Sequence, residues 1–247
     1  MRMLFLWRLQ MESLKKHIRY FKRGEIFLWS TSILVIIVSF FMFDRENYLT
    51  LAASLIGVTS LIYNAKGNPF GQLLMVIFSL MYGMISWRCR YYGEMITYLG
   101  MTMPMAIFAL VSWLRNPYNG NRAEVRVNRI KPGETVFAAA LTLIVTAVFY
   151  FILKWFGTAN LLFSALSVTT SFLAVYLTFR RSAGFAIAYA ANDIVLIVLW
   201  ILAARTDISY LSVMACFAAF LANDIYGYIS WQRMAKRQNM QTKNPSA

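Results

Sequence analysis

Long apolar stretches alternate with short polar segments from residue 26 onward. Each stretch has about 18 or more residues and few charges, the length that an α-helix needs to cross the hydrocarbon core of a bilayer. Because lipid cannot satisfy an open backbone, stretches of this kind are expected to be helices. The pattern predicts eight membrane spans, at 26–43, 48–65, 68–87, 95–114, 135–153, 156–179, 182–204 and 208–231.

Composition supports an all-α polytopic membrane protein and argues against an ordinary soluble domain. The chain is 60% hydrophobic and only 14% charged, whereas soluble domains are roughly 45–50% apolar and about 25% charged. A net charge of +14 would suggest nucleic-acid binding in a soluble protein. Here the Lys and Arg residues lie between the spans, so we expect a lipid bilayer and no nucleic acid.

The basic residues also predict an orientation. With eight spans and a cytoplasmic N-terminus, 19 Lys and Arg residues fall inside and 5 fall outside, in agreement with the positive-inside rule. Both termini are then cytoplasmic, with a basic loop at 115–134 and a tail at 232–247 that we expect to fray from residue 238. Residues 1–25 are predicted to form an amphipathic helix on the anionic leaflet, the alternative being a solvated basic tail.

Matching spacings indicate two three-helix bundles, 48–114 and 156–231. Such bundles share one orientation only if an odd number of spans links them, and 135–153 is that linking helix. Span 26–43 is then an extra helix. The matched pairs are Gly71–Trp87 and Gly184–Trp200, 16 residues apart, and Tyr92–Trp113 and Tyr210–Trp231, 21 residues apart.

Two Asn-Asp pairs, Asn192-Asp193 and Asn223-Asp224, are the most distinctive polar feature within the spans. Ionisable groups inside a membrane are costly and usually face a cavity or a partner helix. At 1.5 Å per residue both pairs lie at a similar depth near the midplane, so two antiparallel helices can present them to one cavity. The alternative is that they only bond neighbouring helices together.

Further residues share helical faces with these pairs or form a polar stripe in span 68–87. They extend the candidate substrate-binding set by Gln72, Tyr82, Tyr189, Trp200 and Tyr228. Trp87, Trp113 and Trp231 fall near the membrane surfaces and are either gates or part of an interfacial aromatic belt, as Trp200 also could be. Pro104 is expected to kink its span.

The chemistry of these side chains restricts the solute. No Lys or Arg lies deep in a span, so an anionic solute finds no counter-charge there. Rings, amides and carboxylates suit a cationic or neutral aromatic solute that carries hydroxyls. Nucleotide-binding and hydrolase motifs are absent, and Cys89, Cys216 and His17 are too few for a metal site. We therefore predict no enzyme, cofactor or metal; an intramembrane hydrolase or a non-transporting scaffold are the alternatives.

One stretch resembles a known family. Asp-Ile-Tyr-Gly-Tyr-Ile-Ser-Trp at 224–231 is similar to the Asn-Ile-Tyr-Gly-x-x-x-Trp signature of the PnuC-type vitamin transporters, whose best-known substrate is nicotinamide riboside. Asp224 departs from the expected Asn, and Phe185 and Tyr189 stand where relatives often carry Trp. Supporting stretches are Arg180-Arg181, 184–195 and Tyr92-Gly93-Glu94, which is followed by Pro104.

The resemblance implies a fold related to the SWEET sugar transporters, a site that includes Tyr226, and a homotrimer. It also implies facilitated diffusion, or uniport, of nicotinamide riboside across the bacterial inner membrane, with trapping by cytoplasmic phosphorylation. Thiamine and riboflavin transporters share the scaffold and remain alternatives. A proton-coupled carrier that uses Asp193 or Asp224 is another, because a carboxyl group in a low dielectric can bind and release a proton.

Overall fold

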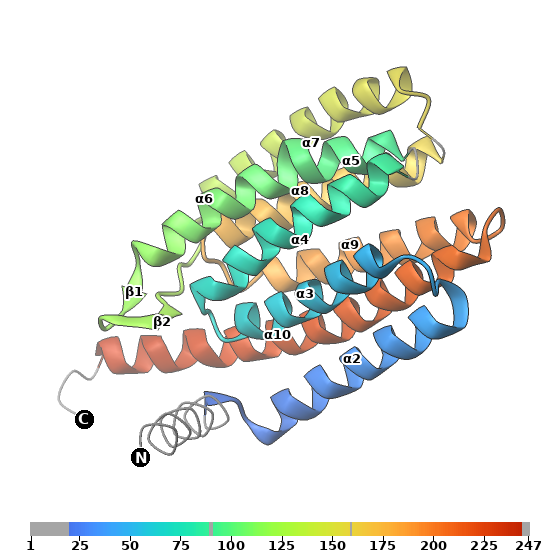
Figure 1. Ribbon diagram of the computed structural model, residues 1–247. Coiled ribbons are helices and arrows are strands. Elements are labelled where there is room, and N and C mark those ends of the chain that lie inside the picture. The colour runs from blue at the N-terminus through green and yellow to red at the C-terminus, as the bar shows by residue number, and fades with distance from the viewer. Residues whose placement is uncertain (1–19, 89–90, 159, 244–247) are drawn as a thin grey trace, which may run out of the picture.

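The computed structural model describes residues 20–88, 91–158 and 160–243 (Figure 1). Within these residues, eight helical segments are long and apolar enough to cross a membrane, which confirms the predicted number. Residues 1–19 of the predicted amphipathic segment lie outside the described part of the chain, as does Cys89.

The fourth span is built from two helices and a turn between them, and the eighth begins with a 3₁₀ turn, Ile208–Tyr210. The helices are α2 (Arg23–Phe43), α3 (Tyr48–Ala65), α4 (Pro69–Arg88), α5 (Tyr92–Thr97), α6 (Met103–Leu114), α7 (Pro132–Trp155), α8 (Leu161–Phe179), α9 (Phe185–Ala203) and α10 (Leu211–Lys243).

Helix packing divides the molecule into two three-helix bundles. In the first bundle α4 packs against α3 and α6, and in the second α9 packs against α8 and α10. The bundles meet reciprocally, because α10 packs on α3 and α6 packs on α8. Helix α7 covers α8, while α2 covers α10 and α3 on the opposite side (Figure 1). The predicted relation to the SWEET fold remains a prediction.

The Arg180-Arg181 motif ties three parts of the molecule together at the turn between α8 and α9. Arg180 forms an ion pair with Glu134 at the start of α7. Arg181 donates from Nη1 to Ser112 Oγ in α6 at 2.7 Å and from Nε to the carbonyl oxygen of Arg126 at 3.2 Å. The motif therefore fixes the linking helix and the first bundle to the second.

The kink at Pro104 remains a prediction, but a π-helical turn lies immediately before this residue. Pro104 lies in the first turn of α6 and has no amide hydrogen for the preceding helix. The π-helical turn Tyr98–Thr102 comes immediately before α6. Because such a turn inserts an extra residue, it resets which side chains face inward, and these turns often occur at functional sites.

The basic loop at 115–134 contains a hairpin that sequence analysis did not predict. Strands β1 (Pro117–Tyr118) and β2 (Asn121–Val125) pair antiparallel. Asn119 and Gly120 connect them with φ values of 46° and 76°, and positive φ at both positions is what a two-residue turn of this kind requires. The Asn-Gly pair was the available signal. Val125 is fully buried and donates from its backbone N to Gly67 O at 2.9 Å.

The expected fraying from residue 238 is wrong, because α10 continues to Lys243. Gln238 holds this extension against the hairpin. Its side-chain oxygen accepts from Val127 N at 2.9 Å, and its Nε2 donates to Glu124 Oε1 at 2.8 Å and to Val125 O at 3.1 Å. We call the end of the molecule formed by this hairpin, the α3–α4 turn and the α8–α9 turn the basic end.

Two glycines at equivalent places in the repeats are expected to differ sharply in tolerance to substitution. A Cβ on Gly71 would lie 2.7 Å from Asn64 N and 2.2 Å from Asn64 Oδ1, whereas a Cβ on Gly184 meets nothing closer than 3.7 Å. We expect Gly71→Ala to destabilise the protein by about 1–3 kcal/mol and Gly184→Ala to leave it nearly unchanged. Thermal unfolding in detergent measures both, and equal losses would contradict the packing of α3 on α4.

Candidate functional site

A narrow cavity of about 30 Å³ lies between the two bundles. The first bundle contributes mostly apolar and aromatic side chains, whereas the second contributes every acid and amide at the cavity wall. Residues from the first bundle are Leu61, Met75, Phe78, Tyr98 and Thr102, and those from the second are Ser171, Tyr189, Asn192, Asp193, Phe217, Phe220 and Asp224.

The acid pair, Asp193 on α9 and Asp224 on α10, is the most polar feature of the cavity. Both residues are buried, and their carboxyl groups lie close enough to interact electrostatically. Within the described residues, Asp193 Oδ2 has no hydrogen-bond partner. Two adjacent carboxylates away from water repel each other strongly. The pair therefore needs a shared proton or a cation beside it.

Asn192 is held in place by a row of hydroxyl groups on α8. Its Oδ1 accepts from Thr170 Oγ1 and Ser171 Oγ, both at 2.9 Å, and from Ser167 Oγ at 3.4 Å. Because these donors occupy the amide oxygen, its NH₂ group is the part left to donate elsewhere. Asn192 lines the cavity, so a fixed amide donor stands next to the acid pair.

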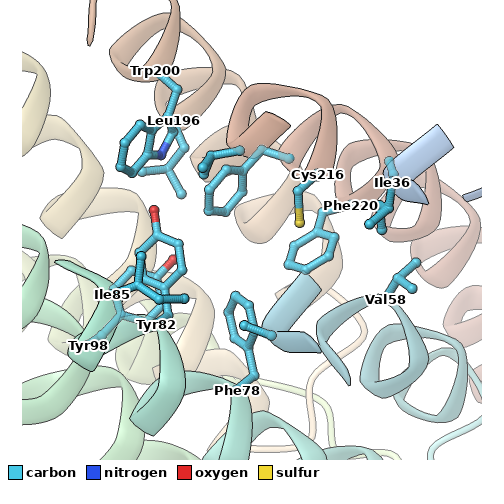
Figure 2. Close-up of a cluster of buried hydrophobic side chains, with 14 of the residues drawn as sticks. Ile36, Val58, Phe78, Tyr82, Ile85, Tyr98, Leu196, Trp200, Cys216 and Phe220 are labelled. Atoms are coloured by element: carbon cyan, nitrogen blue, oxygen red, sulfur yellow. The ribbon is translucent and has the colours of Figure 1, made fainter. Parts of the chain in front are cut away.

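A group of aromatic rings that includes the cavity residue Tyr98 lies toward the end of the molecule away from the basic end. Tyr82 and Tyr98 pack with ring centroids 4.3 Å apart, and Tyr82 meets Trp200 edge-on at 6.3 Å. Tyr91 and Tyr210 each lie 5.4 Å from the Trp200 ring. Figure 2 shows Tyr82 and Tyr98 together opposite Trp200, with Phe78 and Phe220 on the other side of the group. We call these five residues, Tyr82, Tyr91, Tyr98, Trp200 and Tyr210, the tyrosine cluster.

At the basic end, two tryptophans bind the bundles to each other reciprocally. Trp113 of the first bundle donates from Nε1 to Thr178 O in α8 at 2.9 Å. Trp231 of the second bundle donates from Nε1 to Asn64 O in α3 at 2.7 Å. Their rings are 5.3 Å apart and fully buried, and Phe185 packs 4.8 Å from Trp231. We call these two hydrogen bonds and rings the tryptophan latch.

The exposure of the four tryptophans helps to decide whether they belong to an interfacial aromatic belt or act as gates. A residue of an interfacial belt is partly exposed to lipid, so the belt interpretation is wrong for the buried residues Trp113, Trp231 and Trp200. Trp87 is 62% exposed at the end of α4 and belongs to neither aromatic group. The repeat thus has equivalent residues, Trp87 and Trp200, in opposite environments.

The structure brings four of the predicted binding residues to the cavity: Tyr189, Asn192, Asp193 and Asp224. Tyr82 and Trp200 belong to the tyrosine cluster. Two others lie near the latch instead: Gln72 donates to Asn64 Oδ1 at 2.8 Å, and Tyr228 packs against the cluster of buried residues that contains both latch tryptophans.

Asn223 and Tyr226 face α2 rather than the cavity. Asn223 donates from Nδ2 to Ser32 Oγ at 2.8 Å, and the Tyr226 hydroxyl donates to Glu25 Oε1 at 2.8 Å. Neighbouring residues on a helix are separated by about 100° around its axis. Once Asp224 points into the cavity, residues one before and two after it must point elsewhere, which corrects their expected position.

Sequence analysis missed eight residues of the cavity wall. Ser171 belongs to a row with Ser164 and Ser167 at helical spacing, and this polar stripe on α8 was a usable signal. Tyr98 and Thr102 reach the wall through the π-helical turn, which a regular helical period does not predict. The others, Leu61, Met75, Phe78, Phe217 and Phe220, look like ordinary core residues in the sequence.

Comparison with known proteins agrees with this architecture. Two curated relatives, each named nicotinamide riboside transporter PnuC, are 24% identical: one from Neisseria mucosa over 218 residues (87% of this chain, 83% of the relative) and one from Haemophilus influenzae over 223 residues (86% and 91%). A solved structure titled as the vitamin B3 transporter PnuC has the same fold, with a TM-score of 0.77 and 22% identity over 88% of this chain and 94% of that one.

A family model described as nicotinamide mononucleotide transporter matches residues 47–233. The match begins just before α3 and ends beyond the latch residue Trp231, so it contains both bundles and the linking helix and leaves out the whole of α2. It also contains all the residues that line the cavity. The chain therefore belongs to the nicotinamide mononucleotide transporter family, as its resemblance to the PnuC-type transporters predicted.

Proposed function

We propose that this protein carries nicotinamide riboside across the bacterial inner membrane by facilitated diffusion. The observation that supports this most strongly is the chemistry of the cavity. Its acid pair suits the positive charge of the pyridinium ring, its aromatic rings suit stacking and cation–π contact, and Asn192 suits the ribose hydroxyls. Nicotinamide riboside is also the solute in the names of both curated relatives.

The cavity favours the riboside over the mononucleotide named in the family description. A phosphate monoester adds a charge of about −1.5 to −2 at neutral pH. None of the described residues that line the cavity is Lys or Arg, and Asp193 and Asp224 would repel that charge. The same repulsion supports trapping of the solute in the cytoplasm, because a phosphorylated riboside would be repelled by the two acids and could not leave through the carrier.

The small volume of the cavity supports a closed state between two open ones. A volume of about 30 Å³ holds one or two water molecules, whereas sites for small organic ligands measure roughly 300–1,000 Å³. The tyrosine cluster closes one end and the tryptophan latch closes the other. A solute therefore enters when one of these aromatic groups opens and leaves when the other does.

Binding to the purified protein tests this assignment. We expect nicotinamide riboside to bind at least about 30-fold more tightly than nicotinamide mononucleotide, because one unfavourable charge contact near the acid pair is worth about 2 kcal/mol. Isothermal titration calorimetry with nicotinamide riboside, nicotinamide mononucleotide, thiamine and riboflavin measures the order of their affinities. Tight thiamine binding without riboside binding would move the solute to another vitamin, and preference for the mononucleotide would contradict the charge argument.

Proton coupling is a second candidate function, supported by the closeness of the two acids. A pair that shares a proton can release it when a cationic solute arrives. In liposomes, a uniporter is expected to equalise riboside across the membrane whether or not a pH gradient is present. Accumulation of unmodified riboside above equilibrium, only when the gradient is present, would establish coupling instead.

A further inference from the structure

A second cavity, of about 350 Å³, lies at the basic end and is separate from the cavity of the acid pair. Four segments that are distant in sequence surround it: the start of α2, the α3–α4 turn, strand β2 and one face of α10. On α10 the face consists of residues 226, 230, 233, 234 and 237, which recur at helical spacing. The proposed transport of riboside assigns no role to this cavity.

The walls of this cavity are tied together by hydrogen bonds and an ion pair. Lys66 Nζ lies 3.1 Å from Glu25 Oε2 and 4.6 Å from the centre of the Tyr20 ring. The Tyr20 hydroxyl accepts from Asn68 Nδ2 at 3.1 Å and donates to Ala123 O at 3.3 Å. These contacts connect α2 to the α3–α4 turn and to the hairpin, so the cavity is already formed.

Both carboxylates of the cavity already have partners. Glu25 is 2% exposed and accepts from the Tyr226 hydroxyl at 2.8 Å in addition to its pairing with Lys66. Glu124 forms an ion pair with Arg237 and accepts from the side chain of Gln238. Each acid is therefore neutralised by a cation of the same cavity.

Two cations of the cavity have no acidic partner within the described residues. They are the side chains of Lys22 at the start of α2 and Arg233 on α10, both exposed. With Lys66 and Arg237 matched by the two carboxylates, Lys22 and Arg233 leave the cavity a formal net charge of about +2. A cavity with this charge suits a doubly charged anion.

We propose that this cavity binds a phosphate-bearing anion, held by Lys22 and Arg233. A guanidinium group donates two parallel hydrogen bonds to phosphate, and a lysine adds a point charge. The volume falls in the range of small-ligand sites. Basic pockets between membrane helices near the bilayer surface also receive phospholipid headgroups. The phosphate is therefore supplied either by an anionic lipid or by a soluble phosphorylated compound.

The full chain in lipid nanodiscs allows the two sources to be separated. In one arm the nanodiscs contain only zwitterionic phosphatidylcholine and inorganic pyrophosphate is titrated; in the other they contain phosphatidylglycerol. Thermal unfolding is measured for the wild type, for Lys22→Gln/Arg233→Gln and for Arg23→Gln/Lys236→Gln. The last variant is a matched control, because its residues are exposed on the same two helices but lie outside the cavity.

We expect at least one arm to raise the unfolding temperature of the wild type and the control equally. The cavity variant should bind at least about tenfold more weakly, since it lacks two charge-assisted contacts. A rise with phosphatidylglycerol alone identifies a lipid headgroup, and a rise with pyrophosphate alone identifies a soluble source. If neither arm raises the temperature, or if all three proteins respond equally, the proposal is overturned.

Two further measurements keep this test independent of folding and of transport. Arg233→Gln alone removes an exposed side chain that forms no hydrogen bond or ion pair with the described residues, so it should fold and still show weaker binding than Lys236→Gln. Nicotinamide riboside binding should be the same in the cavity variant as in the control. Loss of riboside binding in every protein would contradict the proposed transport function and leave the result for the anion site unaffected.

Discussion

Replacing both Asp193 and Asp224 by asparagine is expected to weaken nicotinamide riboside binding by about 30-fold, or about 2 kcal/mol. The substitution keeps the size of the side chains and removes the charge that compensates the pyridinium cation. The reduced dihydro form of the riboside has nearly the same shape and no such charge. Its affinity should change less than about threefold, because neutral contacts of similar geometry remain.

The comparison of these two ligands separates attraction by charge from a role in shaping the cavity. Isothermal titration of both ligands against the wild type and Asp193→Asn/Asp224→Asn provides the four affinities. Equal losses for both ligands would mean that the acids maintain the shape of the cavity. Unchanged affinities would mean that the solute binds elsewhere, and the proposed site would then be wrong.

Removing either indole donor of the tryptophan latch is expected to open the basic end about tenfold more often. Trp113→Phe or Trp231→Phe keeps a buried ring but removes one of the donors to a carbonyl oxygen. Thr178 O still accepts from Arg181 N, and Asn64 O still accepts from Gly67 N. Because the carbonyl oxygen keeps its backbone donor, the loss of the indole hydrogen bond costs about 0.5–1.5 kcal/mol, and 1.4 kcal/mol corresponds to a factor of ten. The closed state alone loses this stabilisation if the bond breaks on opening.

A cysteine placed in the cavity reports this opening. Ser171→Cys, in a Cys89→Ser/Cys216→Ala background, should react with maleimide in detergent about tenfold faster when either latch residue is Phe. Trp87→Phe is the matched control, because Trp87 is exposed and outside the latch. Equal rates in all variants would show that the latch does not limit access to the cavity from the basic end.

The membrane spans could be predicted from the sequence because their information is local. Each apolar stretch specifies its own helix in lipid, whatever its neighbours are. The hairpin and the helical extension beyond Trp231 depend instead on contacts between distant segments. Gln238 is polar and looks like tail sequence, and only its contacts with Glu124 and Val125 make it part of an ordered helix.

The depth of the candidate site residues in the membrane could be predicted from the sequence, but the direction in which their side chains point could not. Counting residues placed Asp193 and Asp224 at one level of the membrane, and both line one cavity. Counting could not decide which face of α10 points inward, because that depends on α2, which has no counterpart in the repeat. Trp87 and Trp200 show the same limit, since equivalent positions in two repeats differ in burial once other helices cover only one of them.

The uneven composition of the cavity wall has a consequence for how cargo would move. Asn192, Asp193 and Asp224 all belong to the second bundle, while the first bundle presents apolar and aromatic side chains, with only the hydroxyl groups of Tyr98 and Thr102 among them. A solute held by directional hydrogen bonds and ion pairs stays with the surface that supplies them. Apolar contacts are not directional, so they allow the solute to shift along the surface. The second bundle would thus hold the solute while the first bundle moves relative to it, so the two repeats would have different roles in transport.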